Sequence, residues 1–159
     1  MKTLIVYDSV YGNTERIAKA IGDAITGDAI TGDVKVSHAS ELNSSEFKTV
    51  DLLIVGSPTY GGKPTRAIQD LLNKVPVSDF KGASMAAFDT RLSMKLVRIF
   101  GYSAEKIAGS LKNKGWTIVV PPEGFFVKGK KGPLEEGELE RAAGWAKEIV
   151  KRKSSLATK

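Results

Sequence analysis

The chain has 159 residues, of which 42% are hydrophobic and 26% charged, as expected for one globular domain. It has no cysteine and one histidine, which excludes disulfides, thiolate catalysis and cysteine-bound or multi-histidine metal sites, and we expect a reducing, cytoplasmic setting. The net charge of +6 is spread along the chain, and no apolar stretch is long enough to span a bilayer. We therefore expect neither nucleic-acid binding nor membrane binding.

Short apolar runs alternate with helical patterns along the chain. Five runs have the length of strands, and most are continuously apolar, which is typical of strands buried on both faces. The predicted strands are Leu4–Tyr7, Val34–Val36, Leu52–Gly56, Ala83–Phe88 and Thr117–Val120. The segment Pro121–Pro133, rich in Gly and Lys, is predicted to be a loop with room for a short extra strand.

Four segments carry apolar residues at helical spacing. The first begins at Asn13 or Thr14 and is expected to end near Gly27, because residues 28–32 repeat residues 23–27 and would turn their isoleucine off the apolar face. The other predicted helices are Pro64–Lys74, Ser103–Lys114 and Glu138–Lys153. We expect one domain over residues 1–153 and a disordered tail over residues 154–159.

This strict alternation predicts an α/β fold of three layers, in which a parallel sheet has helices on both faces. Five strands fit the order 2-1-3-4-5 of the flavodoxin-like fold. In such sheets ligands bind beyond the carboxyl ends of the strands, where the first and third strands meet. The loops after the first, third and fourth strands are therefore the expected site.

The first of these loops, Ser9–Thr14, reads Ser-Val-Tyr-Gly-Asn-Thr and leads into a predicted helix. Hydroxyl groups, backbone amides and the positive end of a helix dipole suit a phosphate group. The same residues can also do no more than cap the helix. From these residues alone, both interpretations stand.

The loop resembles the phosphate loop of flavodoxins, whose pattern is Thr/Ser-x-Thr/Ser-Gly-x-Thr, and is most similar to that of the flavodoxin modules of flavo-diiron proteins. Tyr11 departs from this pattern, because a hydroxyl-bearing Thr or Ser is usual there. The resemblance implies a short-chain flavodoxin-like domain that binds FMN. The residues it implies around the phosphate are Ser9, Val10, Tyr11, Gly12, Asn13 and Thr14.

The loop after the third strand resembles the flavodoxin loop that covers one face of the flavin ring. The residues implied as its FMN contacts are Pro58, Thr59, Tyr60, Gly61, Gly62 and Lys63. The resemblance implies that Tyr60 stacks on the ring and that a peptide at Tyr60-Gly61 or Gly61-Gly62 can turn toward it. A glycine-rich turn with an exposed tyrosine is the alternative.

After the fourth strand, Asp89, Thr90 and Arg91 are candidates for the other face of the ring by position, although the family's Gly-x-Gly-Asp pattern is absent. The stretch Leu92–Phe100 is partly apolar and can belong to the core or to a flap near the flavin. We expect the positive charges of Lys63 and Arg91 to stabilise the reduced, anionic flavin.

The implied function is that of an FMN-binding electron carrier, because no side chain stands out as a proton donor for catalysis. The alternative is an FMN-dependent reductase of a small acceptor such as a quinone. Flavodoxins are typically acidic, whereas this chain carries +6, so we expect a redox partner protein with an acidic or apolar docking surface. We expect a monomer or a weak homo-oligomer, with no metal site.

Overall fold

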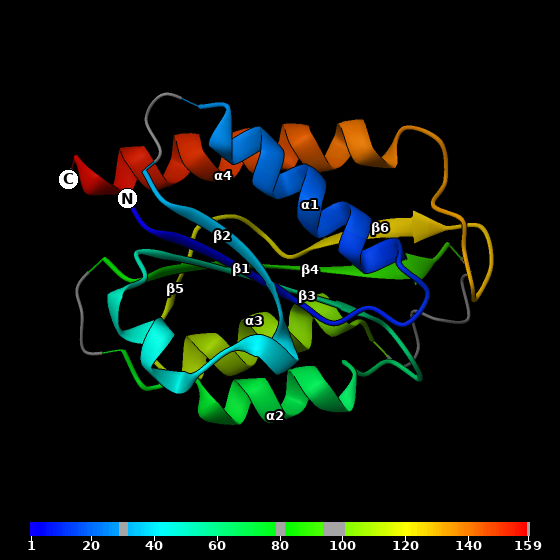
Figure 1. Cartoon of the computed structure of the whole chain (residues 1–159), viewed down its shortest axis with the longest axis horizontal. Coiled ribbons are helices and arrows are strands. Elements are labelled where there is room, and N and C mark those ends of the chain that lie inside the picture. Colours follow the sequence, from blue (N-terminus) through cyan, green and yellow to red (C-terminus); the bar gives the residue numbers. More distant parts are fainter. Residues whose placement is uncertain (29–31, 79–81, 94–100, 159) are drawn as a thin grey trace.

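A parallel sheet lies between two layers of helices, with α1 and α4 on one face and α2 and α3 on the other (Figure 1). The computed structural model describes residues 1–28, 32–78, 82–93 and 101–158. The strands are β1 Thr3–Tyr7, β2 Val34–His38, β3 Leu52–Pro58, β4 Ser84–Leu92, β5 Thr117–Ile118 and β6 Glu123–Val127. The helices are α1 Asn13–Thr26, α2 Arg66–Lys74, α3 Ser103–Asn113 and α4 Glu138–Ala157, with short 3-10 helices at Ala39–Glu41 and Ser44–Thr49.

The strand order β2-β1-β3-β4-β5 confirms the predicted topology, and every pairing is parallel. The fifth position of the sheet, however, is shared by two strands. The strand β5 pairs with the start of β4 at Ser84 and Met85, and β6 pairs with its end from Phe88 to Leu92. Pro121 and Pro122 separate the two strands, because a proline has no amide hydrogen to give to a sheet. The strand predicted at Thr117–Val120 is therefore shorter, and the extra strand is β6.

Alternate residues of each strand face opposite layers, as the pleat of a strand requires. Ile5 and Ile54 face the core beneath α1 and α4, whereas Leu4 and Val55 face the core beneath α2 and α3. All four side chains are buried. Burial on both faces explains why the strands read as continuous apolar runs.

The helix ends agree with the sequence in some places and differ in others. The helix α1 ends at Thr26 with Gly27 as its cap, as predicted, while residues 29–31 of the repeat lie outside the described residues. The helix α2 begins at Arg66 rather than Pro64, because the Thr65 side chain caps its first turn. The helix α4 continues to Ala157, so residues 154–157 are helical and the expected disordered tail is wrong for them.

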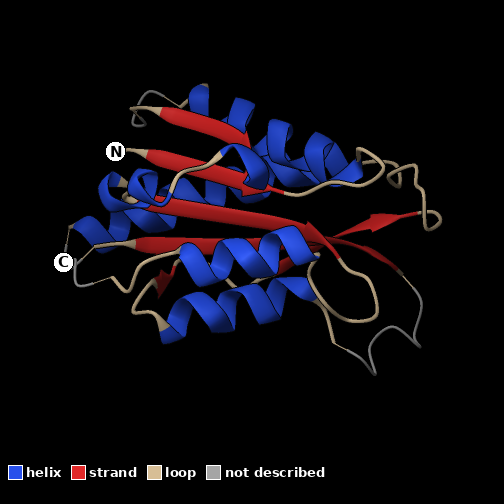
Figure 2. Ribbon diagram, turned by 60° about the horizontal axis from the view of Figure 1, so that its bottom comes forward, coloured by secondary structure: helices blue, strands red, loops and turns tan. Residues whose placement is uncertain are grey.

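The carboxyl ends of β1, β3 and β4 point to the same end of the molecule, away from both chain termini (Figure 2). The loops that leave β1 and β3 lie there, together with the turn after β6. The fold thus brings the predicted loops together at one edge of the sheet.

Candidate functional site

A hollow opens at the carboxyl ends of β1, β3 and β4, at the switch point of the strand order. Its open space, counted out to the surrounding solvent, is about 430 Å³. Most of the predicted site residues line it together, namely Ser9, Val10, Tyr11, Asn13, Thr14, Pro58, Thr59, Tyr60, Thr90 and Arg91.

The other predicted residues are close to the hollow but do not line it. They are Gly12, Gly61, Gly62, Lys63 and Asp89. The three glycines and the lysine belong to the two loops that shape the hollow. Asp89 is different, because its side chain bonds to the start of α3 instead.

Leu92, the first residue of the stretch considered as core or flap, also lines the hollow, and the sequence reasoning missed Val127 and Lys130 as lining residues. Val127 ends β6 and Lys130 lies in the turn that follows it. The sequence left this region as a loop of unknown course, so it held no signal that would place these residues beside Ser9–Thr14. Of the apolar stretch Leu92–Phe100, residues 94–100 lie outside the described residues.

The loop after β1 leaves the start of α1 open. Gly12 is the N-cap residue of this helix, and as a glycine it gives the first turn no side-chain hydrogen bond. The amide of Gly12 donates to Ser9 Oγ at 3.1 Å, and the buried hydroxyl of Thr14 lies 2.9 Å from that of Thr90. Residues 8–14 include no Lys or Arg. Amides, hydroxyls and the helix dipole therefore form a seat for an anion built from neutral donors.

The beginning of this loop is fixed by Asp8 and by the only histidine of the chain. Asp8 Oδ1 accepts a hydrogen bond from the amide of Ser9 at 2.9 Å and lies 2.8 Å from His38 Nε2. His38 also packs edge-on against the ring of Tyr7. The ends of β1 and β2 are thereby tied together just before the chain enters the hollow.

A tight turn follows β3. The backbones of Tyr60 and Lys63 exchange two hydrogen bonds, of 3.1 and 3.0 Å. Between them Gly61 and Gly62 have φ angles of 56° and 76°, a left-handed conformation that side chains disfavour. The ammonium group of Lys106 on α3 donates to the carbonyl of Gly62. The turn is thus fixed by its own backbone and by a neighbouring helix, and it holds Tyr60 at the hollow.

The aromatic rings of Tyr11 and Tyr60 line the hollow. Tyr11 is 42% exposed. Burial, with smaller contributions from Tyr11 and Asp8, raises the pKa of the Tyr60 phenol. Tyr60 therefore stays neutral at physiological pH and offers an apolar face against which a flat ring can pack.

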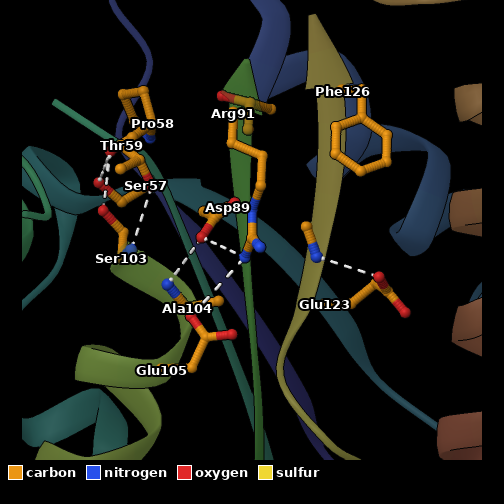
Figure 3. Close-up of polar contacts among 12 residues, drawn as sticks. Ser57, Pro58, Thr59, Asp89, Arg91, Ser103, Ala104, Glu105, Glu123 and Phe126 are labelled. Atoms are coloured by element: carbon orange, nitrogen blue, oxygen red, sulfur yellow. Dashed lines mark hydrogen bonds and ion pairs between the residues drawn. The ribbon is translucent and has the colours of Figure 1, made fainter. Parts of the chain in front are cut away.

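The end of β4 carries a buried ion pair (Figure 3). The guanidinium of Arg91 donates to both oxygens of the Asp89 carboxylate, at 2.7 and 2.8 Å. One face of the guanidinium lies over the ring of Tyr102, with Cζ 3.5 Å from the ring centre, and a carboxylate oxygen of Glu105 is 3.7 Å from Nη2. The Asp89 side chain is fully buried, and that of Arg91 is 12% exposed. The charge of Arg91 is thus compensated within the protein.

The same pair fixes the start of α3. Asp89 Oδ2 accepts a hydrogen bond from the amide of Ala104 at 2.9 Å, which satisfies one free donor of the first helical turn. Burial raises the pKa of the Asp89 carboxyl, while the bonds from Arg91 and Ala104 act in the opposite direction. We assign Asp89 a structural role at this helix start.

The first residue of α3 also bonds to the end of β3 and to the residue that follows it (Figure 3). The amide of Ser103 donates to Thr59 Oγ1 at 3.0 Å, and its hydroxyl donates to the carbonyl of Pro58 at 3.2 Å. The amide of Thr59 donates in turn to the carbonyl of Thr90. The backbone on this side of the hollow is therefore cross-linked by hydrogen bonds.

Comparison with known proteins agrees with this geometry. The family model described as flavodoxin matches residues 5–145. The chain belongs to the flavodoxin family. No curated protein matches it, but many solved structures do. An archaeal flavodoxin is 24% identical with a TM-score of 0.79, covering 97% of this chain and 99% of its own. Flavodoxin 1 of Bacillus cereus is 21% identical with a TM-score of 0.80, covering 95% and 98%.

The likeness extends to larger proteins. The rubredoxin:oxygen oxidoreductase of Desulfovibrio gigas is 19% identical with a TM-score of 0.78, over 99% of this chain and 37% of that one. A flavodiiron core from Synechocystis has a TM-score of 0.75. The expected similarity to flavodoxin modules of flavo-diiron proteins is confirmed.

Flavodoxins bind FMN and transfer electrons, and both expectations are confirmed for this chain by its family. The family does not favour the quinone reductase. The donor set fits the cofactor, because an open helix start with hydroxyls suits a phosphate and two tyrosine rings suit a flavin. In the described part of the chain, no helix is long and apolar enough to cross a membrane. Among those residues, no group of acidic or histidine side chains is arranged to hold a metal ion.

Proposed function

We propose that this flavodoxin carries electrons between partner proteins by means of one FMN held in the hollow at the ends of β1, β3 and β4. One observation carries the proposal. The uncapped start of α1, the hydroxyls of Ser9 and Thr14, and the rings of Tyr11 and Tyr60 all face the same hollow. A phosphate and a flat ring are parts of one FMN molecule, and the hollow offers suitable chemistry for each.

The proposal divides the cofactor contacts among three segments. Ser9–Thr14 bind the phosphate with hydroxyls and backbone amides. Pro58–Lys63 lie along one side of the ring, with Tyr60 packed on it, and Thr90 and Arg91 lie on the other side. Bound FMN accepts and returns the electrons, while the chain binds it, orients it and limits the access of water. Asp89 acts indirectly, by holding the start of α3 beside the site.

We further propose that the partner docks with an acidic surface. The chain carries a net charge of +6, and Lys63 and Lys130 are exposed beside the hollow. Opposite charges steer encounter and orient two proteins, mainly by raising the association rate. Charge favours the acidic surface over an apolar one. A monomer or weak homo-oligomer in the cytoplasm remains the prediction for the protein itself.

Two measurements test the proposal. Titration of FMN fluorescence should give one FMN per chain, and a protein that leaves the fluorescence unchanged would contradict it. The reduced holoprotein should then pass electrons to an acidic electron-transfer protein at a rate that falls steeply with salt. Saturable turnover with a small quinone, and no transfer to the acidic protein, would instead support the reductase.

A further inference from the structure

The turn after β6 lies against the start of α1. Asn13 Nδ2 donates to the carbonyl of Lys131 at 3.2 Å, across 118 positions of sequence. Gly132 is packed so closely that a Cβ atom there would lie 2.7 Å from the Asn13 side chain. The turn after β6, which is distant in sequence, is thus bonded to and packed against the loop that forms the anion seat.

The course of this segment is fixed by its own backbone. The amide of Lys128 donates to the carbonyl of Pro133, and that of Gly132 donates to the carbonyl of Gly129, each at 2.9 Å. The second bond closes a β-turn with Lys130 and Lys131 at its two central positions. Lys130 therefore lies at the tip of a fixed turn and not in a loose loop.

Of the three lysines in this turn, Lys130 lines the hollow, together with Ser9, Asn13 and Thr14. Lys128 is also exposed but does not line it. Lys130 takes part in none of the ion pairs found among the described residues. Its charge is therefore available at the one part of the hollow that is built for an anion.

We propose that Lys130 pairs with the phosphate of FMN, so that the seat combines neutral donors from Ser9–Thr14 with one cation from the turn after β6. The inference rests on the proposed FMN site. A lysine ammonium acts on a phosphate as a point charge on a flexible stem, and its contribution is modest where water screens it. The contact also explains why the turn is bonded to Asn13, since that bond sets the distance between the lysine and the seat.

The test compares FMN with riboflavin, which has the same ring and no phosphate. At low salt, Lys130→Ala should weaken FMN binding by about 3- to 5-fold, as expected for a partly screened charge pair. Riboflavin affinity should change less than about 2-fold, and the loss for FMN should shrink in high salt. Lys130→Arg should restore FMN binding, and the control Lys128→Ala, which removes the same charge from the same turn, should leave both affinities unchanged.

Other results of these measurements would contradict either the role of Lys130 or the FMN site itself. If Lys130→Ala binds FMN as tightly as the wild type, the inference is wrong while the FMN site stands. An equal loss for FMN and riboflavin would also overturn it, because Lys130 would then support the ring or the turn. An equal loss of FMN affinity in Lys128→Ala would contradict the inference as well, because the effect would then come from net charge alone. A wild-type protein that binds neither flavin would overturn the proposed function itself.

Discussion

The loop after β1 and the end of β4 line the same hollow, but their polar groups are bonded differently. At Ser9–Thr14 the N-cap glycine provides no side-chain bond to the helix start, and the polar residues Ser9, Asn13 and Thr14 line the hollow. At the end of β4, Asp89 and Arg91 form an ion pair, and Asp89 also accepts a hydrogen bond from the first turn of α3. Since a polar group that is buried must find a partner, the difference indicates which groups serve a ligand and which serve the fold.

The largest effect is expected at the Asp89–Arg91 ion pair, on the free energy of unfolding. Asp89→Ala leaves Arg91 in a largely buried place without its main partner and removes the bond to the Ala104 amide. We expect the free energy of unfolding to fall by about 3–4 kcal/mol, as when one partner of a buried pair is removed. Urea unfolding followed by circular dichroism measures the change.

A double variant shows where this loss comes from. Adding Arg91→Met to Asp89→Ala removes the uncompensated charge, so it should recover part of the lost stability. A double variant no more stable than the single one would place the loss in the Ala104 bond instead. If Asp89→Ala alone costs less than about 1 kcal/mol, the pair is not a structural element.

A smaller effect, on FMN binding and not on stability, is expected in the loop Ser9–Thr14. Thr14→Val removes a hydroxyl proposed to bond to the FMN phosphate, and the loss of binding free energy should be about 1.5–3 kcal/mol, as for a bond to a charged acceptor. Thr14→Ser keeps the hydroxyl and should bind FMN nearly as well as the wild type. Calorimetric titration should find riboflavin affinity unchanged in both variants, and parallel losses for FMN and riboflavin would contradict a phosphate contact.

The smallest effect concerns the reduction potential. Lys63 is exposed in the turn after β3, and its charge should favour the reduced, anionic flavin, so Lys63→Ala should lower the second reduction potential by about 20–40 mV at low salt. The charge of Arg91 is compensated, so the pair of substitutions Asp89→Asn and Arg91→Met should shift that potential by less than about 10 mV. Spectroelectrochemistry at two salt concentrations compares them. A larger shift in the double variant would mean that Arg91 acts on the flavin directly.

Much of this protein could be read from its sequence, because the relevant patterns are local. Continuous apolar runs that alternate with helical spacing predict a parallel sheet with helices on both faces, and the number of strands fits the order 2-1-3-4-5. The loop Ser9–Thr14 is also local, because its hydroxyls, its glycine and the helix that follows are neighbours in the chain. The same holds for the end of α1 at Gly27.

Tertiary structure decided what depends on residues far apart in the chain. The pleat of β4 turns Asp89 toward α3 while Thr90 faces Thr14, and only the packing of both layers shows which partner each one meets. The split of the last sheet position into β5 and β6 depends on how β4 is paired along its length. Lys130 lines the hollow because the pairing of β6 with β4 and the bond from Asn13 bring the turn after β6 there, and no spacing along the chain encodes these contacts.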